Sequence, residues 1–165
     1  MDLARIRNGD TDAFGRFLSE HYDMIFRTAW RWCGNQTDAE DIAQNVCVKL
    51  ASALSSFDGR SSISTWLHRI VINTVHDLHR SNRKHKHHDT VDENHIPSLA
   101  NQENALQSKQ ILSAIRMLPE RQRDAVLLVH AEGLSHAEAG AVMGCSENTV
   151  SYHIHTARKA LRAML

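Results

Sequence analysis

The sequence predicts an all-α protein built of two small helical domains joined by a flexible linker. Apolar residues recur at intervals of three and four along most of the chain, which is the pattern of amphipathic helices. Only two prolines occur among the 165 residues, so few positions are barred from helix interiors. The composition changes abruptly after the first half of the chain, which predicts domains at residues 1–84 and 106–165 and a linker at residues 85–105.

The overall charge excludes a protein that coats nucleic acid with its whole surface. Lys and Arg number 19 and Asp and Glu number 19, so the net charge is 19 − 19 = 0, although it is unevenly distributed. The three cysteines are an odd number without a C-x-x-C pair, which indicates reduced thiols. No apolar run is long enough to cross a membrane, and residues 1–10 lack a signal-peptide pattern. We therefore expect a soluble protein of the cytoplasm.

Two helices are expected in the first third of the chain. Residues 12–33 carry a stripe of aromatic and aliphatic side chains at helical spacing, which predicts a core face. Residues 38–54 form the second helix, with Thr37 as N-cap and Glu40 at the capping-box position. Its buried stripe is expected to comprise Ile42, Val46, Leu50 and Leu54.

The second helix also has a face without an evident partner inside the chain. Its residues are Asp38, Asp41, Gln44, Asn45 and Val48. Acidic residues in a first turn favour the helix dipole, so a well-started helix is one interpretation of this face. A binding surface for another molecule is the other.

A loop at residues 55–63 leads into a third helix, for which Ser64 is the expected N-cap. From residue 60 to residue 88 there are six Lys and Arg against one Asp, a net of 6 − 1 = +5. With Phe57 and Trp66 nearby, such a helix suits a strand of nucleic acid, because cations meet phosphates and aromatic rings stack on exposed bases. A solvated basic face with Trp66 in the core is the equally supported alternative. The face comprises Arg69, Asn73, His76, Arg80 and Arg83.

Residues 89–105 contain four acidic residues, one proline and no Lys or Arg, which predicts a segment without fixed structure of its own. A helix is expected from Leu106 to Leu118, where Pro119 ends it, and residues 121–130 continue as another helix.

The end of the chain, residues 134–165, predicts a helix-turn-helix motif. Ser135 and Glu138 form a capping box, Gly140 permits close helix contact, Gly144 supplies the turn and Ser146 caps the second helix. One stripe of that helix is apolar: Val150, Ile154, Ala157, Leu161 and Leu165. The opposite side carries short polar groups that suit base edges in a major groove: Asn148, Thr149, Ser151, Tyr152, His155 and Thr156. An ordinary helical hairpin is the alternative.

The sequence predicts neither a metal site nor a cofactor nor catalysis. Histidines cluster at His85, His87 and His88, but no Cys or carboxylate stands at a metal-ligand spacing. The cluster is better explained as a pH-tunable addition to the basic segment. No nucleophile–base pair and no glycine-rich phosphate loop occurs, so we expect a protein that is not an enzyme.

A series of residues in register across nearly the whole chain resembles the sigma-70 family of bacterial RNA polymerase sigma factors, in its extracytoplasmic-function (ECF) group. The series comprises Gly9, Asp10, Ala13, Phe14, Tyr22, Asp38, Ala39, Glu40, Asp41, Gln44, Phe57, Trp66, Leu67, Asn73, Asp77, Arg80, Leu118, Pro119, Arg123, Gly133, Leu134, Ser135, Gly144, Ser146, Thr149, Val150, Ala157, Arg158 and Leu161.

The resemblance implies a region-two domain that binds the clamp helices of core RNA polymerase and recognises and melts the −10 promoter element. It implies a region-four domain that reads the −35 element of promoter DNA and contacts the polymerase flap. A cognate anti-sigma factor, often membrane-anchored, is a further implied partner, and no small-molecule substrate is expected.

The site residues expected from these roles fall into three sets. The polymerase-binding set is Asp38, Glu40, Asp41, Gln44 and Asn45. The −10 set is Phe57, Ser61, Ser62, Trp66, Arg69, Asn73, His76, Arg80 and Arg83. The −35 set is Asn148, Thr149, Ser151, Tyr152, His155, Thr156, Arg158 and Lys159.

The chain departs from the family pattern at several positions. Asn45, Cys47 and Ala51 stand where a glutamate, an aromatic residue and a tryptophan are common, and Ser151-Tyr152-His153 replaces a frequent basic-small-basic triplet. Two other functions stay open beside a sigma factor. One is a stand-alone helix-turn-helix regulator, and the other is a sigma mimic that sequesters an anti-sigma factor.

Overall fold

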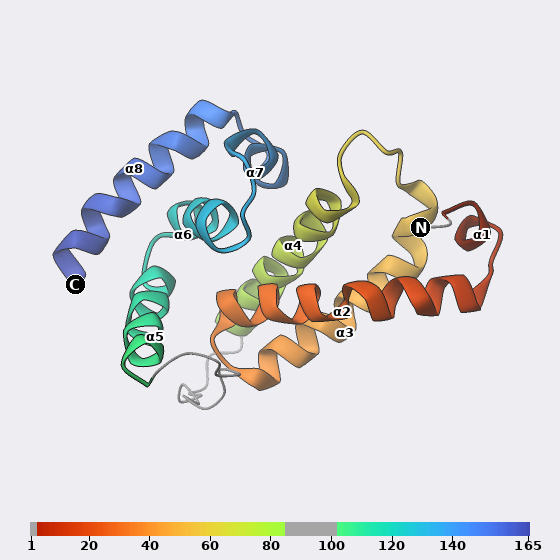
Figure 1. Cartoon of the computed structure of the whole chain (residues 1–165), viewed down its shortest axis with the longest axis horizontal. Helices are drawn as coiled ribbons and strands as arrows, with labels where there is room; N and C mark the ends of the chain where they lie inside the picture. Colours follow the sequence, from red (N-terminus) through yellow and green to blue (C-terminus); the bar gives the residue numbers. More distant parts are fainter. Residues whose placement is uncertain (1–2, 85–101) are drawn as a thin grey trace. The chain divides into compact units, whose positions relative to one another are not determined.

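The computed structural model describes residues 3–84 and 102–165, and all regular structure within them is helical (Figure 1). The chain divides into two compact units, Met1–Thr90 and Val91–Leu165, which are described separately below. The predicted all-α fold class is confirmed. The histidine cluster at residues 85–88 and most of the predicted linker lie outside the described residues, whereas residues 102–105 already belong to a helix.

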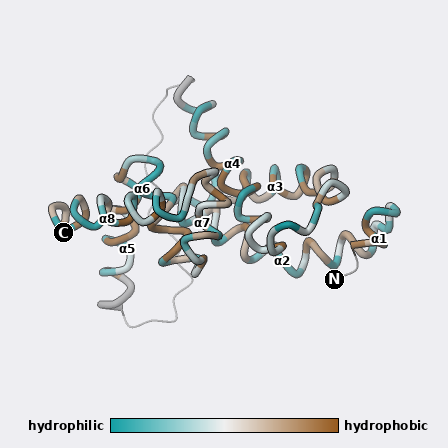
Figure 2. Tube along the Cα trace, turned by 90° about the horizontal axis from the view of Figure 1, so that it is seen from above, coloured by the Kyte–Doolittle hydropathy of each residue, from teal (hydrophilic) through white to brown (hydrophobic). Residues whose placement is uncertain are grey.

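The first unit is a bundle of three long helices with a short helix at one end (Figure 1). Its elements are α1 (Leu3–Arg7), α2 (Thr11–Cys33), α3 (Gln36–Ala53), the 3-10 turn η1 (Leu54–Ser56) and α4 (Ile63–Lys84). The three long helices pack pairwise against one another, and α1 packs on η1. Hydrophilic and hydrophobic positions alternate along α4 in Figure 2, as expected of a helix with one face in a core.

The core of this unit follows the predicted stripes with two exceptions, both in α2. The helical spacing predicts Tyr22 in the core, but it is 39% exposed. The stripe of α3, from Ile42 to Leu54, is fully buried as predicted. In α2, the apolar positions at intervals of three and four include Trp30 and not Trp32. The largest fully buried side chain in the described part of the chain is nevertheless Trp32, at 1% exposure. Both tryptophans lie near the stripe, and the packing of α3 and α4 decides which of them is enclosed.

Two predicted N-caps are wrong, and in both cases the cap lies two residues earlier. Asn35, not Thr37, caps α3: its Oδ1 accepts from the amide of Asp38 at 2.8 Å, and its Nδ2 donates to Asp38 Oδ2 at 2.8 Å. Ser62, not Ser64, caps α4, because its Oγ accepts from the amide of Thr65 at 3.0 Å. Asn, Ser and Thr cap helices by the same geometry, so each start had several equivalent candidates in the sequence.

The second unit packs α5, α6 and α7 against α8. Its elements are α5 (Gln102–Arg116), α6 (Glu120–Val126), the π-helical η2 (Leu127–Ala131), α7 (His136–Met143) and α8 (Glu147–Met164). Helices α6 and α7 both lie against α8, and α5 contacts α6 and α8 (Figure 1). The predicted core residues Val150, Ile154 and Ala157 are buried, but Leu165 is 70% exposed. Leu165 is the C-cap of α8, and its amide still donates to the carbonyl oxygen of Leu161 at 3.1 Å.

The turn between α7 and α8 forms as the sequence predicts. Ser135 Oγ accepts from the amide of Glu138, and Glu138 Oε2 accepts from the amide of Ser135 at 2.9 Å, which completes the capping box. Gly144 has φ of 67°, a left-handed conformation that favours glycine and lets the chain reverse at once. Ser146 then caps α8 by accepting from the amide of Thr149 at 3.2 Å. The helix-turn-helix prediction is therefore confirmed at the level of local structure.

Candidate functional site

One side of α3 is exposed and carries most of the residues predicted to bind polymerase. Asp41, Gln44, Asn45 and Val48 follow one another at helical spacing, and all four are exposed. Val48 is 73% exposed, although the opposite side of the same helix is fully buried. This stripe, which we call the α3 surface, thus offers a partner one acidic group, two side-chain amides and an exposed apolar side chain at its carboxy-terminal end.

The acidic first turn of α3 is partly used within the helix itself. Asp38 is half-buried, and its Oδ2 accepts the hydrogen bond from Asn35 Nδ2 described above. Glu40 accepts a hydrogen bond from Gln36 Nε2 at 2.7 Å. Asp38 therefore fits the interpretation as the start of a helix. Asp41 faces solvent and is available to a binding partner.

The predicted −10 residues of α4 lie along one side of that helix. They succeed one another at intervals of three and four residues: Trp66, Arg69, Asn73, His76 and Arg80. Arg69, Asn73 and Arg80 are exposed, while Trp66 and His76 are half-buried. Arg83 stands in the last turn of α4, and its side chain is outside the description. In the preceding loop, Ser61 is half-buried, and Ser62 is occupied as the N-cap.

The two aromatic residues proposed to stack on bases contact each other. The ring centroids of Phe57 and Trp66 are 5.1 Å apart, and the rings are tilted by 56°. Phe57 is only 6% exposed, so its ring belongs to the core beneath the loop. Trp66 is half-buried, so part of its ring faces solvent. Of the two rings, Trp66 is therefore the one with a solvent-facing surface.

Helix α1 braces this loop from the amino-terminal side. The guanidinium of Arg7 donates a hydrogen bond to the carbonyl oxygen of Phe57. Two residues earlier, Arg5 Nε donates to Asp10 Oδ2 at 2.7 Å, and Asp10 Oδ1 accepts from the amide of Ala13 at 2.9 Å as the N-cap of α2. The amide of Ala13 and the Arg5 guanidinium hold the pKa of the Asp10 carboxyl below its usual value.

A charge network joins α3 to the basic side of α4. Lys49 Nζ lies 3.2 Å from Asp77 Oδ2 and donates to Thr74 Oγ1 at 3.0 Å. The other carboxylate oxygen of Asp77 accepts from Arg80 at 3.2 Å. Asp77 thus balances two cations at once, one of them a predicted −10 residue.

Helix α8 presents the predicted base-reading residues on the side away from the core. Asn148, Ser151, Tyr152 and His155 are exposed, and Thr149 and Thr156 are half-buried. Tyr152 is 65% exposed, and the edge of its ring meets His153 at a centroid distance of 5.7 Å. Arg158 and Lys159 follow on the next turn, and both are exposed.

The first helix of the motif adds a residue that sequence reasoning missed. His136 Nδ1 lies 2.8 Å from Ser151 Oγ, which places an imidazole beside the side of α8 that is predicted to read bases. The two residues are 15 positions apart, and no periodicity links them. The charge pattern could have pointed to His136. No Lys or Arg occurs between Arg123 and Arg158, so histidines are the only side chains there that can become cations.

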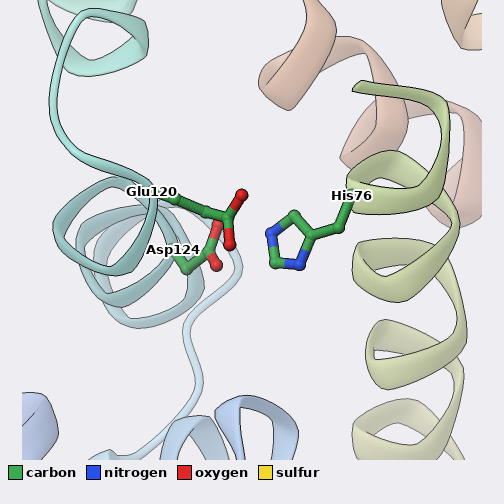
Figure 3. Close-up of side chains that lie close together, drawn as sticks. All are labelled: His76, Glu120 and Asp124. Atoms are coloured by element: carbon green, nitrogen blue, oxygen red, sulfur yellow. The ribbon is translucent and has the colours of Figure 1, made fainter. Parts of the chain in front are cut away.

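Potential metal ligands occur in both units. Figure 3 shows His76 as a side chain of α4, and Glu120 and Asp124 as side chains four residues apart on α6. His76 belongs to the first unit and the two carboxylates to the second. Taken by itself, neither unit brings three such ligands together within the described residues.

Over residues 3–84 and 102–165, no helix combines the length and the apolar character needed to cross a bilayer. The cysteines Cys33, Cys47 and Cys145 are free thiols and half-buried. Burial raises the pKa of the Cys47 thiol above its ordinary value.

Both units match families described in known proteins. Residues 17–85 match Sigma-70 region 2, and residues 108–161 match Sigma-70, region 4. The first match covers α3 and α4, and the second covers the helix-turn-helix motif.

Three curated proteins are similar over nearly the whole chain. The ECF RNA polymerase sigma factor SigW of Bacillus subtilis is 29% identical over 99% of this chain and 94% of that protein. The ECF RNA polymerase sigma-E factor of Escherichia coli K12 is 30% identical over 96% of this chain and 90% of that protein. The RNA polymerase sigma-H factor of Pseudomonas aeruginosa is 31% identical over 96% of this chain and 89% of that protein.

Two solved structures share the fold. CnrH, solved in complex with the cytosolic domain of CnrY, is 26% identical with a TM-score of 0.72 and covers 98% of this chain and 93% of its own. The sigma factor RpoE, co-crystallised with the anti-sigma factor NepR from Bartonella quintana, has a TM-score of 0.76 at 24% identity, covering 92% of this chain and 96% of its own. The region matches and the relatives agree with the helix-turn-helix motif: the chain belongs to the ECF group of the sigma-70 family of RNA polymerase sigma factors.

Proposed function

We propose that this alternative sigma factor, which directs promoter recognition and transcription initiation, docks on core RNA polymerase through the α3 surface. The observation that carries the proposal is the exposure of Asp41, Gln44, Asn45 and Val48 on a helix whose other side is fully buried. An exposed carboxylate beside an apolar side chain fits a partner that offers a cation and a small hydrophobic patch. Asn45 supplies an amide where relatives often carry a glutamate, so Asp41 supplies the acidic charge of this stripe.

The −10 element is assigned to the exposed side of α4. Arg69 and Arg80 provide cations for phosphates, Asn73 provides hydrogen bonds for a base edge, and the solvent-facing part of Trp66 provides a stacking surface. Phe57 supports Trp66 from below rather than meeting bases. Strand opening then comes from binding energy, since capture of unstacked bases offsets the cost of unstacking them. The chemistry of RNA synthesis belongs to the polymerase, and the sigma factor itself is not an enzyme.

The −35 element is assigned to the exposed side of α8. Asn148, Ser151, Tyr152 and His155 lie where a recognition helix meets base edges, and Arg158 and Lys159 lie one turn further, where phosphates or the polymerase flap would be met. An anti-sigma factor is a further proposed partner, because the structurally similar RpoE was crystallised with one. Since polymerase and promoter DNA are cytoplasmic in bacteria, the protein is proposed to act in the cytoplasm.

The test of polymerase docking is run-off transcription and pull-down with purified core polymerase. Asp41→Arg and Val48→Glu should each weaken core binding by about tenfold or more, since 1.4 kcal/mol corresponds to tenfold and a reversed charge in an interface costs at least that. Glu20→Arg on α2 makes the same charge change at another exposed position and should bind like the parent protein. Core binding by Asp41→Arg equal to that of Glu20→Arg would refute the assignment.

A further inference from the structure

The helix-turn-helix motif (residues 134–165) contains no Lys or Arg before Arg158. Between residues 124 and 157 there are four carboxylates, no Lys or Arg, and four histidines: His130, His136, His153 and His155. Affinity for duplex DNA depends largely on cations that neutralise phosphates. Any phosphate contact from the start of α7 through most of α8 therefore requires a neutral donor or a protonated imidazole.

His136 is the histidine whose position is defined by the fold. It is the first residue of α7, it is half-buried, and its Nδ1 is 2.8 Å from Ser151 Oγ on α8. Ser151 is exposed and lies in the second turn of the recognition helix. The imidazole is therefore fixed at the seam between the two helices, on the side of α8 that is proposed to face the −35 element.

The hydrogen bonds around Ser151 decide which ring nitrogen carries the proton. Ser151 Oγ also lies 3.1 Å from the carbonyl oxygen of Glu147, which can only accept. The hydroxyl has a single proton, so donating it to this carbonyl makes His136 Nδ1–H the donor to Ser151. In that arrangement Nε2 is the nitrogen that gains a proton when the ring becomes cationic. The new N–H is a charge-assisted donor suited to a phosphate oxygen.

Charged groups on the neighbouring elements act on this ring from several directions. Glu147 and His155 lie one turn before and one turn after Ser151 on α8. Glu138 on α7 is engaged in the capping box, and Arg121 of α6 donates to the carbonyl of Met143 at the far end of α7. The remaining charged or titratable groups on these elements are Glu120, Arg123, Asp124, His130, Glu132, His153, Arg158, Lys159 and Arg162.

We propose that protonated His136 binds a DNA phosphate next to the −35 element, with Ser151 as the residue that positions its ring. The inference rests on the assignment of α8 to the −35 element. It makes recognition of that element stronger as pH falls through about 8 to 5, the range in which imidazoles protonate. Because phosphate affinity would then depend on a titratable group, acidification of the cytoplasm would favour the promoters of this factor.

The experiment measures holoenzyme binding to a duplex promoter fragment that the parent holoenzyme has selected from a random library. The slope of log affinity against log salt is determined at pH 8 and at pH 6, since each neutralised phosphate contributes about 0.9 to that slope. The parent slope should steepen on acidification, and it should steepen by about 0.9 less in His136→Asn. His130→Asn removes an exposed histidine of η2 and should retain the full parent response. Circular dichroism melts confirm folding of each variant.

A second variant tests the charge directly. His136→Lys carries a permanent cation, so it should bind DNA more tightly than the parent at pH 8. Its salt slope should steepen by about 0.9 less than that of the parent between pH 8 and pH 6. The proposal is overturned if the salt slope of His136→Asn steepens on acidification as much as that of the parent. It is also overturned if His130→Asn reduces this steepening as much as His136→Asn does. Run-off transcription at pH 8 distinguishes failure of the proposed function from failure of the His136 proposal. A parent holoenzyme that initiates normally but shows no His136 effect refutes this inference alone, whereas failure of the parent to initiate refutes the proposed function.

Discussion

The carbonyl oxygen of Cys145 lies 2.6 Å from the point that a Cβ on Gly140 would occupy. Gly140 is buried in α7, and its other nearest neighbours at 3.4 Å are also backbone atoms of the turn, so none of them can rotate away. Gly140→Ala should therefore destabilise the helix-turn-helix unit by about 1–3 kcal/mol despite the better helix propensity of alanine. Urea unfolding followed by circular dichroism measures the effect.

Gly15 provides the matched control for this substitution. It is exposed within α2, and a Cβ there would meet nothing within 4 Å. Gly15→Ala should stabilise the protein by about 0.5–1 kcal/mol, because alanine loses less backbone entropy in a helix. A Gly140→Ala protein stabilised to the same extent as Gly15→Ala would contradict the tight turn described here.

Asp77→Asn should change DNA binding more than stability. The Lys49–Asp77 and Arg80–Asp77 pairs are between about half and three-quarters exposed, so losing them should cost less than about 1 kcal/mol of unfolding free energy. Both cations then become available to phosphates, and binding of holoenzyme to a −10 fork-junction DNA should become tighter and more salt-dependent. Asp23→Asn on α2 is the control. Weaker DNA binding by Asp77→Asn would mean that Asp77 holds Arg80 in its working position instead.

The acid stability of the first unit should depend on Asp10. The pKa of this carboxyl is lowered in the folded state by the Ala13 amide and the Arg5 guanidinium. Its stabilising contribution is present above the pKa of the unfolded state and is lost as pH falls through the lower folded pKa. Asp10→Asn keeps an N-cap but no charge, so its unfolding free energy should fall less than that of the parent below about pH 4.

Arg5→Gln separates the two causes in the same titration. It removes the guanidinium but keeps the hydrogen bond from the Ala13 amide to the Asp10 carboxylate. The loss of unfolding free energy at acidic pH should therefore lie between those of the parent and Asp10→Asn. Identical curves for all three proteins would show that Asp10 does not contribute to the pH dependence.

Cys47 should react slowly with alkylating reagents at neutral pH. Burial raises the pKa of its thiol, so the thiolate fraction at pH 8 is below that of an ordinary cysteine. In a background with Cys33→Ser and Cys145→Ser, iodoacetamide should modify Cys47 more slowly than N-acetylcysteine, and the rate should climb more steeply above pH 8. A rate equal to that of N-acetylcysteine would contradict this environment.

Tyr152 and Arg158 should affect promoter choice in different ways. Tyr152 is 65% exposed on the base-reading side of α8, so Tyr152→Ala should alter the ranking of sequences that holoenzyme selects from a library, at about 1–3 kcal/mol per affected base pair. Arg158→Ala should weaken all sequences alike and reduce the salt slope by about 0.9. An unchanged ranking for Tyr152→Ala would remove Tyr152 from base readout.

The local structure of the helix-turn-helix motif could be predicted because each of its features depends on a few neighbouring residues. The Ser135–Glu138 capping box and the left-handed Gly144 follow from side-chain size and hydrogen-bonding capacity alone. The cap of α3 could not be predicted in the same way. Asn35 and Thr37 are both good caps, and the reciprocal bonds between Asn35 and Asp38 decide between them.

Features that depend on packing between helices were less predictable. Whether Trp30 or Trp32 is enclosed depends on how α3 and α4 lie against α2. Phe57 and Trp66 were equivalent aromatic candidates in the sequence, yet only Trp66 retains exposed surface. The His136–Ser151 contact exists only because the turn at Gly144 brings two helix starts together.

The stretch from residue 124 to residue 157, which contains no Lys or Arg, also bears on how the protein finds its targets in a chromosome. A genome presents about 10⁶–10⁹ competing sites of random sequence, and attraction to them comes almost wholly from permanent positive charge. Because this stretch has no permanent cation, it contributes little to such non-specific attraction, which depends instead on Arg158, Lys159 and the basic side of α4.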